Sequence, residues 1–493
     1  MKKVGFDNDQ YIKLQSKNIV KRVKKFNKLY LEFGGKLFDD FHASRVLPGF
    51  EPDSKIKMLL KLKDKAEVLM VINANHIEKN KMRSDLGITY SQDLMRLIDA
   101  FSQVGLQVGG VVITRFNEQE AAIELRKKLE KSKIKVAYLY YLENYPNDIN
   151  TILSKDGFGK NEYIETEKPI VVVTAPGPGS GKMITCLSQM YHDNTKGIKA
   201  GYAKFETFPI WNLPLNHPVN LAYEAATIDL NDVNMIDPFH LEAYKEVAIN
   251  YNRDVETFPV LNDLLKRISG KSIYKSPTDM GVNMVGNCIV DDAVCQEAAK
   301  DEIIRRYYET AVAIRKGQMD EENIHKIDTI MKKINLDVTD RKVVVSANKL
   351  AKKTGEPAVA IQLPNGKILT GKTSKLMGSS CAAILNALKE LAKIPDMHII
   401  SEFILEPIYE LKTKFLNGNN PRLHTDEILI ALAIGSRTSE YCLKALNALP
   451  LLKGCEAHSS VILSEVDINT FKKLGVNLTQ EPVYQYKKLY HHK

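Results

Sequence analysis

Apolar segments alternate with amphipathic ones through the N-terminal part of the chain. Uninterrupted apolar strands are expected at residues 29–33, 66–74, 108–116 and 134–142, and helical periodicity fills intervals at 54–62, 91–104 and 118–131. Continuous apolar strands separated by helices of this length are typical of a parallel sheet that is covered on both faces. The pattern therefore predicts an α/β fold with a mostly parallel sheet.

The remaining chain predicts two further regions. Residues 290–335 have helical periodicity, with an apolar stripe at Ala298, Ile303, Ile304, Tyr307, Tyr308 and Ala311. A second α/β pattern begins at residue 338 and contains a hairpin turn at 364–366, a helix at 381–393 and a strand near His398. We expect an α/β domain at 1–285, a helical subdomain at 286–336 and a C-terminal α/β subdomain at 337–493.

A glycine-rich turn, TAPGPGSGK, follows an apolar strand at residues 170–174 and opens an amphipathic run. Glycine lets backbone N–H groups approach an anion, a helix N-terminus adds positive potential, and a lysine adds charge. The turn therefore predicts a phosphate site on Gly177, Gly179, Ser180, Gly181 and Lys182. It diverges from the phosphate loop G-x-x-x-x-G-K-[ST], because Pro176 replaces the first glycine and Met183 replaces the hydroxyl that would hold magnesium. A turn without any ligand is the alternative.

The next strand, near residues 201–206, carries a lysine and a carboxylate two residues apart. Lys204 and Glu206 share one face of that strand. If this face meets the glycine-rich turn, Lys204 neutralises a transferring phosphoryl group and Glu206 holds Mg²⁺ or orients the substrate. The alternative is a surface ion pair.

Residues 208–283 have little regular periodicity and are rich in Pro, Asn, Asp and Tyr. Long irregular segments on a rigid scaffold tend to carry binding groups, so we expect the substrate here. Arg253 suits a substrate carboxylate or phosphate. Asp237 and Asp279, in proline-marked turns, are the metal candidates among the acids Asp229, Asp232, Asp237, Asp254 and Asp279, since Mg²⁺ needs only one or two carboxylates beside phosphate oxygens. A turn or cap role is the alternative for each acid.

Composition narrows the setting. A net charge of +9 over 493 residues is mild, so nucleic acid is not an expected partner. The longest apolar run, residues 428–434, is far too short for a membrane span, and no apolar signal region follows the N-terminus, so a cytoplasmic protein is expected. Six cysteines without a C-x-x-C pair predict reduced core residues, and the lack of H-E-x-x-H argues against a zinc protease.

Two local resemblances add to these patterns. The segment AGYAKFE after the glycine-rich turn resembles dethiobiotin synthetase and related ATP-dependent ligases, in which a strand lysine follows the loop. The segment NGKILTG with the helix that begins at Cys381 resembles the core of cytidine deaminases. That resemblance implies a deaminase-like topology, but Ala383 stands where the family has its acid–base glutamate, and P-C-x-x-C is missing, so no zinc is expected.

Long stretches across the chain, such as FDDFHASRVLPGF, NYNRDVE and YKSPTDMGVNM, resemble a bacterial family known as domain of unknown function 1846, some of whose members carry an ATP-dependent zinc protease label. The resemblance implies an α/β N-terminal part and no known activity. The residues favour a phosphate- or nucleotide-binding enzyme, ligase- or kinase-like, that uses ATP and Mg²⁺ on a small polar metabolite. The alternatives are a phosphometabolite-binding protein without turnover and a structural oligomer; spare apolar helices predict a homo-oligomer.

Overall fold

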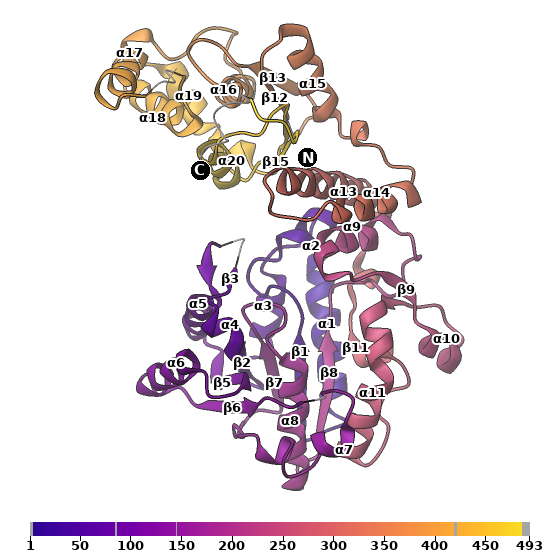
Figure 1. The fold of residues 1–493 in the computed structure, drawn as a ribbon. Helices are drawn as coiled ribbons and strands as arrows, with labels where there is room; N and C mark the ends of the chain where they lie inside the picture. Colours follow the sequence, from indigo (N-terminus) through magenta and orange to yellow (C-terminus); the bar gives the residue numbers. More distant parts are fainter. Residues whose placement is uncertain (1–2, 84–85, 144, 419–421, 486–493) are drawn as a thin grey trace. The chain divides into compact units, whose positions relative to one another are not determined.

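The computed structural model describes residues 3–83, 86–143, 145–418 and 422–485. The chain divides into two compact units, Val4–Ala299 and a second that begins at Lys300 (Figure 1). The helix α13 (Asp292–Arg315) contains the division. No helix in these described ranges is both long and apolar enough to cross a bilayer.

The N-terminal unit is built on a seven-stranded sheet in which every pairing is parallel, as the apolar strands predict. The strand order is β11 (Gly281–Val282), β8 (Ala200–Phe205), β1 (Lys28–Phe33), β7 (Ile170–Thr174), β2 (Ala66–Asn73), β5 (Gln107–Phe116) and β6 (Val136–Tyr140). The side chains of β2 and β7 are buried along the whole of both strands. Continuous burial is what a strand covered by helices on both faces requires.

The connections run in two opposite directions along this sheet. From β1 the chain proceeds to β2, β5 and β6 through α2 (Phe41–Val46), α3 (Ser54–Leu60), α4 (Ala74–Glu78), α5 (Tyr90–Gln103) and α6 (Glu120–Lys131). After α7 (Ile149–Ile152) it returns to β7 and moves the other way, through α8 (Lys182–Thr195), to β8 and β11. Right-handed crossovers in opposite directions place the two groups of helices on opposite faces.

The order of the strands creates two places where connections diverge. The chain leaves β8 in one direction and its neighbour β1 in the other, and it does the same at β7 and its neighbour β2. In open α/β sheets, ligands bind outside the carboxyl ends of strands at such switch points. The topology therefore directs attention to the residues that follow β1, β2, β7 and β8.

The amphipathic N-terminal helix and the segment 208–283 complete this unit. The helix α1 (Asn8–Val23) buries Tyr11, Ile12, Gln15 and Ile19 on one face, and its lysines line the other. The segment 208–283 is more regular than expected, with α9 (Pro218–Ala226), the hairpin β9 (Asn234–Ile236) and β10 (Ile249–Tyr251), α10 (Pro238–Tyr244), α11 (Asn252–Ser269) and α12 (Pro277–Met280). A short antiparallel pair, β3 (Met82–Arg83) and β4 (Ile88–Thr89), precedes α5.

The C-terminal unit contains the separate mixed sheet that the hairpin signal predicts. Its order is β13 (Ile368–Lys372), β12 (Ala358–Gln362), β14 (Glu456–Ser459) and β15 (Asn477–Gln480), with only β14 and β15 parallel. The helices are α14 (Glu322–Lys333), α15 (Lys342–Thr354), α16 (Ser379–Leu391), α17 (Glu402–Glu410), the π-helix Leu411–Phe415, α18 (Thr425–Gly435), α19 (Glu440–Asn447) and α20 (Glu465–Lys473). One apolar core joins this sheet to α16, α18 and α19.

The prediction of a strand near His398 is wrong. Residues 394–400, all within the described part of the chain, form bends and an irregular connection. Ile394, Ile399 and Ile400 are buried in the core that α16 and α18 share. Their apolar side chains therefore fill space between helices and do not line a sheet.

Candidate functional site at the carboxyl edge of the parallel sheet

The glycine-rich turn connects the end of β7 to the first residue of α8, as its sequence predicts. Gly181 is the N-cap of α8 with φ +90°, and a Cβ there would lie 2.8 Å from the Thr114 hydroxyl oxygen. A Cβ at Gly177 would overlap the phenol of Tyr90. Both positions therefore need glycine, one for its backbone conformation and one for close packing.

The loop is fastened to the sheet through its carbonyl groups. The Asn73 side-chain amide donates to the Gly179 carbonyl at 3.1 Å, and the Thr114 hydroxyl donates to the Ser180 carbonyl at 2.7 Å. Since the carbonyls face β2 and β5 and α8 has no side-chain cap, the N–H groups of its first turn keep their positive potential. Such a helix terminus suits an anion.

Positive charge surrounds this loop. Lys182 is the first residue of α8, and Arg115 is the last-but-one residue of β5, with an exposed side chain and φ +51°. Burial first, and then the nearby charges of Lys81, Arg115 and Lys79, together lower the pKa of His76 to about 4. The ring of His76 lies beside Gly179. These cations make the loop a basic site.

A second group of charges lies at the end of β8. The Lys204 ammonium is 2.7 Å from the Glu206 carboxylate and forms a closer ion pair with Asp254, the third residue of α11. Only 20% of the Lys204 side chain, 11% of Glu206 and 14% of Asp254 are exposed. The pair predicted on one strand face is therefore a nearly buried cluster with a third member.

Burial and charge divide the protons of this cluster unequally. Burial, opposed by Lys204 and reinforced by Asp254, raises the pKa of Glu206 to about 7. Burial also acts on Asp254, but the Lys204 charge outweighs it and holds the Asp254 pKa below its usual value. Burial is likewise outweighed at Lys204, whose pKa is raised by Asp254 and Glu206. Glu206 can therefore exchange a proton near neutral pH, which is what a general acid or base requires.

Glu32, at the end of β1, lies between the two groups of charges. Its carboxylate accepts a hydrogen bond of 2.6 Å from the Tyr202 hydroxyl, and its charge reaches Lys204. Burial raises the pKa of the Cys186 thiol, and the charges of Glu32 and Lys182 both act on this thiol as well. The basic loop after β7 and the acid–base cluster after β8 therefore form one continuous edge across β1.

Aromatic rings form a wall beside the acid–base cluster. Tyr223 stacks on Phe208 at 4.9 Å between ring centres and lies near Tyr251 at 5.9 Å. Beyond them Arg253 donates to the Asp232 carboxylate at 3.1 Å. The other Asp232 oxygen and the Tyr251 hydroxyl are buried polar atoms without a hydrogen-bond partner among the described residues. The predicted residue Arg253 thus lies next to Asp254, at the start of α11.

Of the two metal candidates, Asp237 is the N-cap of α10, and Asp279 lies within the short helix α12. One Asp237 oxygen accepts from the His240 N–H at 3.0 Å, and the other accepts from the hydroxyl and the N–H of Thr278. The Asp279 carboxylate accepts from the Tyr244 hydroxyl at 3.0 Å. Groups of three or more His, Cys, Asp or Glu able to hold a metal ion do not occur in the described part of the chain. Metal binding at Asp237 and Asp279 stays a prediction.

Sequence reasoning missed several residues that this edge brings together. Glu32, His76 and Arg115 come from strands or helices distant in sequence from the glycine-rich turn. Their only sequence signal is position, since Glu32 and Arg115 are the last-but-one residues of apolar strands and His76 lies three residues after β2. Asp254 was considered only for metal binding, and its pairing with Lys204 depends on how α11 packs.

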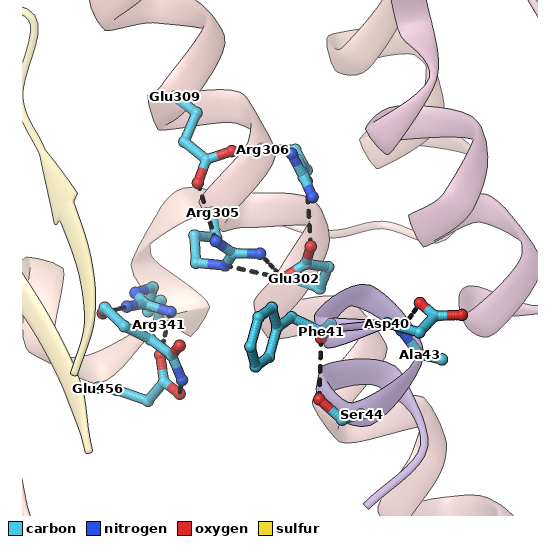
Figure 2. Close-up of polar contacts among 11 residues, drawn as sticks. Asp40, Phe41, Ala43, Ser44, Glu302, Arg305, Arg306, Glu309, Arg341 and Glu456 are labelled. Atoms are coloured by element: carbon cyan, nitrogen blue, oxygen red, sulfur yellow. Dashed lines mark hydrogen bonds and ion pairs between the residues drawn. The ribbon is translucent and has the colours of Figure 1, made fainter. Parts of the chain in front are cut away.

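Several buried polar groups of the C-terminal unit have partners within that unit. The Cys381 thiol, at the start of α16, is buried and donates to the Leu423 carbonyl at 3.1 Å. On α13 the buried Glu302 carboxylate forms ion pairs with Arg305 and Arg306 (Figure 2). The Glu309 carboxylate forms ion pairs with the same two guanidinium groups. Arg341 pairs with Glu456 at 2.7 Å. All six cysteines of the chain are free and buried, as predicted.

Fold and site together define an α/β protein of two units with a glycine loop and an acid–base cluster at the carboxyl edge of a parallel sheet. The chain belongs to the family described as domain of unknown function DUF1846. The N-terminal model of that family matches residues 4–335 and its C-terminal model matches residues 339–490. The bacterial family expected from the sequence is therefore confirmed.

Similar proteins extend over the full length. The chain is 57% identical to a UPF0371 protein of Streptococcus pyogenes serotype M5 (strain Manfredo) over 493 residues, which cover 99% of this chain and 100% of the relative. The same values hold for a UPF0371 protein of serotype M18 (strain MGAS8232). A UPF0371 protein of Streptococcus uberis (strain ATCC BAA-854 / 0140J) is 56% identical with the same coverage. These names state no activity.

Proposed function

We propose that the N-terminal unit is a phosphate-binding enzyme, ligase- or kinase-like, that acts on a small polar metabolite. One observation carries the proposal. A basic glycine loop follows β7 and a nearly buried acid–base cluster lies at the end of β8, and these two strands flank β1. The loop would hold the phosphate of ATP or another nucleotide, and the cluster would act on the second substrate.

The residues divide the chemistry as follows. The first turn of α8, Lys182 and Arg115 neutralise phosphate oxygens, which is the largest part of catalysis in phosphoryl transfer. Lys204 is fixed by its two carboxylates and neutralises developing negative charge on the transferred group. Glu206 takes or returns the proton of the second substrate. Mg²⁺ that accompanies the phosphates would find Glu32 and Glu206 at the same edge.

Ligand-induced stabilisation tests the phosphate site. Phosphate, pyrophosphate, ATP and GTP, each with and without Mg²⁺, are added to the wild-type chain and to the variants Lys182→Ala, Arg115→Ala and Lys127→Ala. A ligand at a hundred times its Kd stabilises the folded protein by about 2.7 kcal/mol, which raises Tm measurably. We expect Lys182→Ala to remove most of this rise and Arg115→Ala to weaken binding about tenfold, since charge-assisted hydrogen bonds are the strong ones.

Lys127→Ala is the matched control, because Lys127 is an exposed lysine on α6, away from the edge. It should bind as the wild type does. A wild-type chain that none of the anions stabilises would refute the phosphate site, and equal loss in all three variants would show a non-specific charge effect.

A second candidate is a protein that binds a phosphometabolite without turnover. The hydroxyl groups of the loop favour it: Ser180 donates to the Gly177 carbonyl at 2.8 Å, Thr185 donates to the Gly181 carbonyl at 2.9 Å, and Met183 follows the lysine. Both hydroxyl groups are thus held by backbone carbonyls, and Met183 has no hydroxyl to offer to Mg²⁺. Release of phosphate or nucleoside diphosphate in a metabolite screen, lost in Glu206→Gln, would favour the enzyme over this candidate.

A further inference from the structure

The helix α18 of the C-terminal unit is apolar around its whole circumference from residue 428 to residue 434. Seven consecutive apolar residues, 428–434, include the buried Ile428, Ala431 and Leu432, which face the core. On the opposite side Ile430 is 59% and Ile434 is 54% exposed, and Ala433 is exposed between them. A helix that is hydrophobic all round is normally buried, so this outer face needs a partner.

The neighbouring helix extends the apolar surface. Phe403, Pro407, Leu411 and Phe415 follow one another at four-residue spacing along α17 and the π-helix, and all four are exposed. Phe403 is 86% and Phe415 75% exposed. A ridge of this length measures roughly 18 Å along the helix axis. These exposed apolar side chains therefore lie on a helix that packs against α18.

The charges at the two ends of the α18 face indicate what covers it. Asp426 lies at the start of the helix and Arg437 in the turn after it, both exposed and, among the described residues, without an ion-pair partner. Asp426 lies on the same face as Ile430 and Ile434, since positions four and eight apart share one side of a helix. Arg437 follows in the turn that continues from the helix end, where its backbone N–H donates to the Ile434 carbonyl. The exposed face of α18 therefore has a negative charge at one end and a positive charge at the other.

We propose that this face is the contact between two copies of the chain, with α18 packed antiparallel on α18 of the second copy. A two-fold axis between Ala431 and Leu432 puts Asp426 of each copy opposite Arg437 of the other, and Ile430 opposite Ala433. The face is then complementary to itself, which is the condition for an isologous dimer. A parallel arrangement would place like charges together at both ends.

Sedimentation velocity between about 1 and 50 µM tests the dimer directly. The wild type should sediment as a particle with twice the chain mass of 55.6 kDa. Ile430→Glu and Ile434→Glu should each give monomers. Val247→Glu is the control, because Val247 is an equally exposed valine, 60%, in the N-terminal unit. Far-ultraviolet circular dichroism checks that each variant keeps its fold.

Charge exchange tests the antiparallel arrangement. Asp426→Arg and Arg437→Asp should each raise the dimer Kd at least tenfold, because each puts like charges together at two symmetric places. The double variant restores opposite charges and should return Kd to within a few-fold of wild type. A monomeric wild type at 50 µM, a dimer that survives Ile430→Glu, or a double variant no better than the singles would each overturn the proposal.

Discussion

The lysine of the acid–base cluster decides how two neighbouring carboxyl groups titrate. Lys204 contacts both Glu206 and Asp254, yet the pKa of Asp254 is lowered while the pKa of Glu206 is raised to about 7. Two nearly buried carboxylates beside one ammonium group cannot both ionise without cost, so the one with the closer contact to Lys204 keeps its charge. This division of roles places the exchangeable proton on Glu206.

A pH-dependent stability difference should follow from Glu206. Its pKa is higher in the folded chain than its ordinary 4.5, so its protonation favours the folded state below pH 4.5, and this contribution is lost as the pH rises to about 7. The glutamine in the Glu206→Gln variant cannot ionise, so this variant does not lose stability in this way as the pH rises. The free energy of unfolding of the wild type relative to Glu206→Gln should therefore fall by about 2–3 kcal/mol between pH 5 and pH 8.

Urea unfolding followed by tryptophan fluorescence measures this difference. Trp211 is the only tryptophan, and its indole donates to the Asn283 carbonyl within the N-terminal unit, so its signal reports that unit. The exposed carboxylate Glu124 on α6 supplies the control Glu124→Gln, which should track the wild type at every pH. A relative stability independent of pH would contradict the raised pKa of Glu206.

At the scale of elements, the turn before α8 depends on its fit against β5. Gly181→Ala puts a Cβ beside the Thr114 side chain at a positive φ, so it should cost about 2–4 kcal/mol of stability and should also abolish phosphate binding. Gly197, beyond the other end of α8, has φ +79° with open space around its Cβ position. Gly197→Ala therefore measures the backbone cost alone, about 1 kcal/mol.

Thermal unfolding with and without pyrophosphate compares the two glycine variants. Equal losses would mean that the contact with Thr114 is unimportant, and phosphate binding by Gly181→Ala would show that the loop tolerates a different shape.

Elements with strong periodicity could be predicted, and those shaped by tertiary packing could not. The strands β2, β5 and β7 and the helices α5 and α6 lie where their apolar patterns place them, because a fully buried strand leaves a continuous apolar run. The helix α11 was missed since Pro259 lies inside it and Asn252 and Arg253 begin it. The expected strand near His398 failed because its isoleucines pack between helices.

At the scale of the whole molecule, strand order determines which residues form the edge. The sequence predicts parallel strands but not that β7 inserts between β1 and β2, and this insertion alone brings Glu32 between the glycine loop and Lys204. The loop residues could be predicted because their motif is local. Arg115 and Asp254 could not, since each reaches the edge through long-range packing that leaves no local pattern.

The C-terminal unit should fold alone and should depend on α13 for part of its stability. The apolar core that joins its sheet to α16 and α18 uses only residues 359–476, so the fragments 300–493 and 337–493 both retain it. Only the longer one keeps Tyr308, whose hydroxyl donates to Glu481 at 3.2 Å and whose ring lies 4.8 Å from His458. We expect the longer fragment to be more stable by about 2–4 kcal/mol, from the buried ring and its hydrogen bond.

Urea unfolding by circular dichroism compares the fragments, with Tyr308→Phe in the longer one to separate the hydroxyl from the ring. That variant should lose about 1 kcal/mol, because Glu481 still accepts from Asn348 at 2.7 Å. If both fragments unfold at the same urea concentration, α13 contributes nothing to this unit. If only the longer fragment folds, α13 is an integral part of its core. The expected result lies between these, because the main core is closed without α13 and the Glu481 contacts add to it.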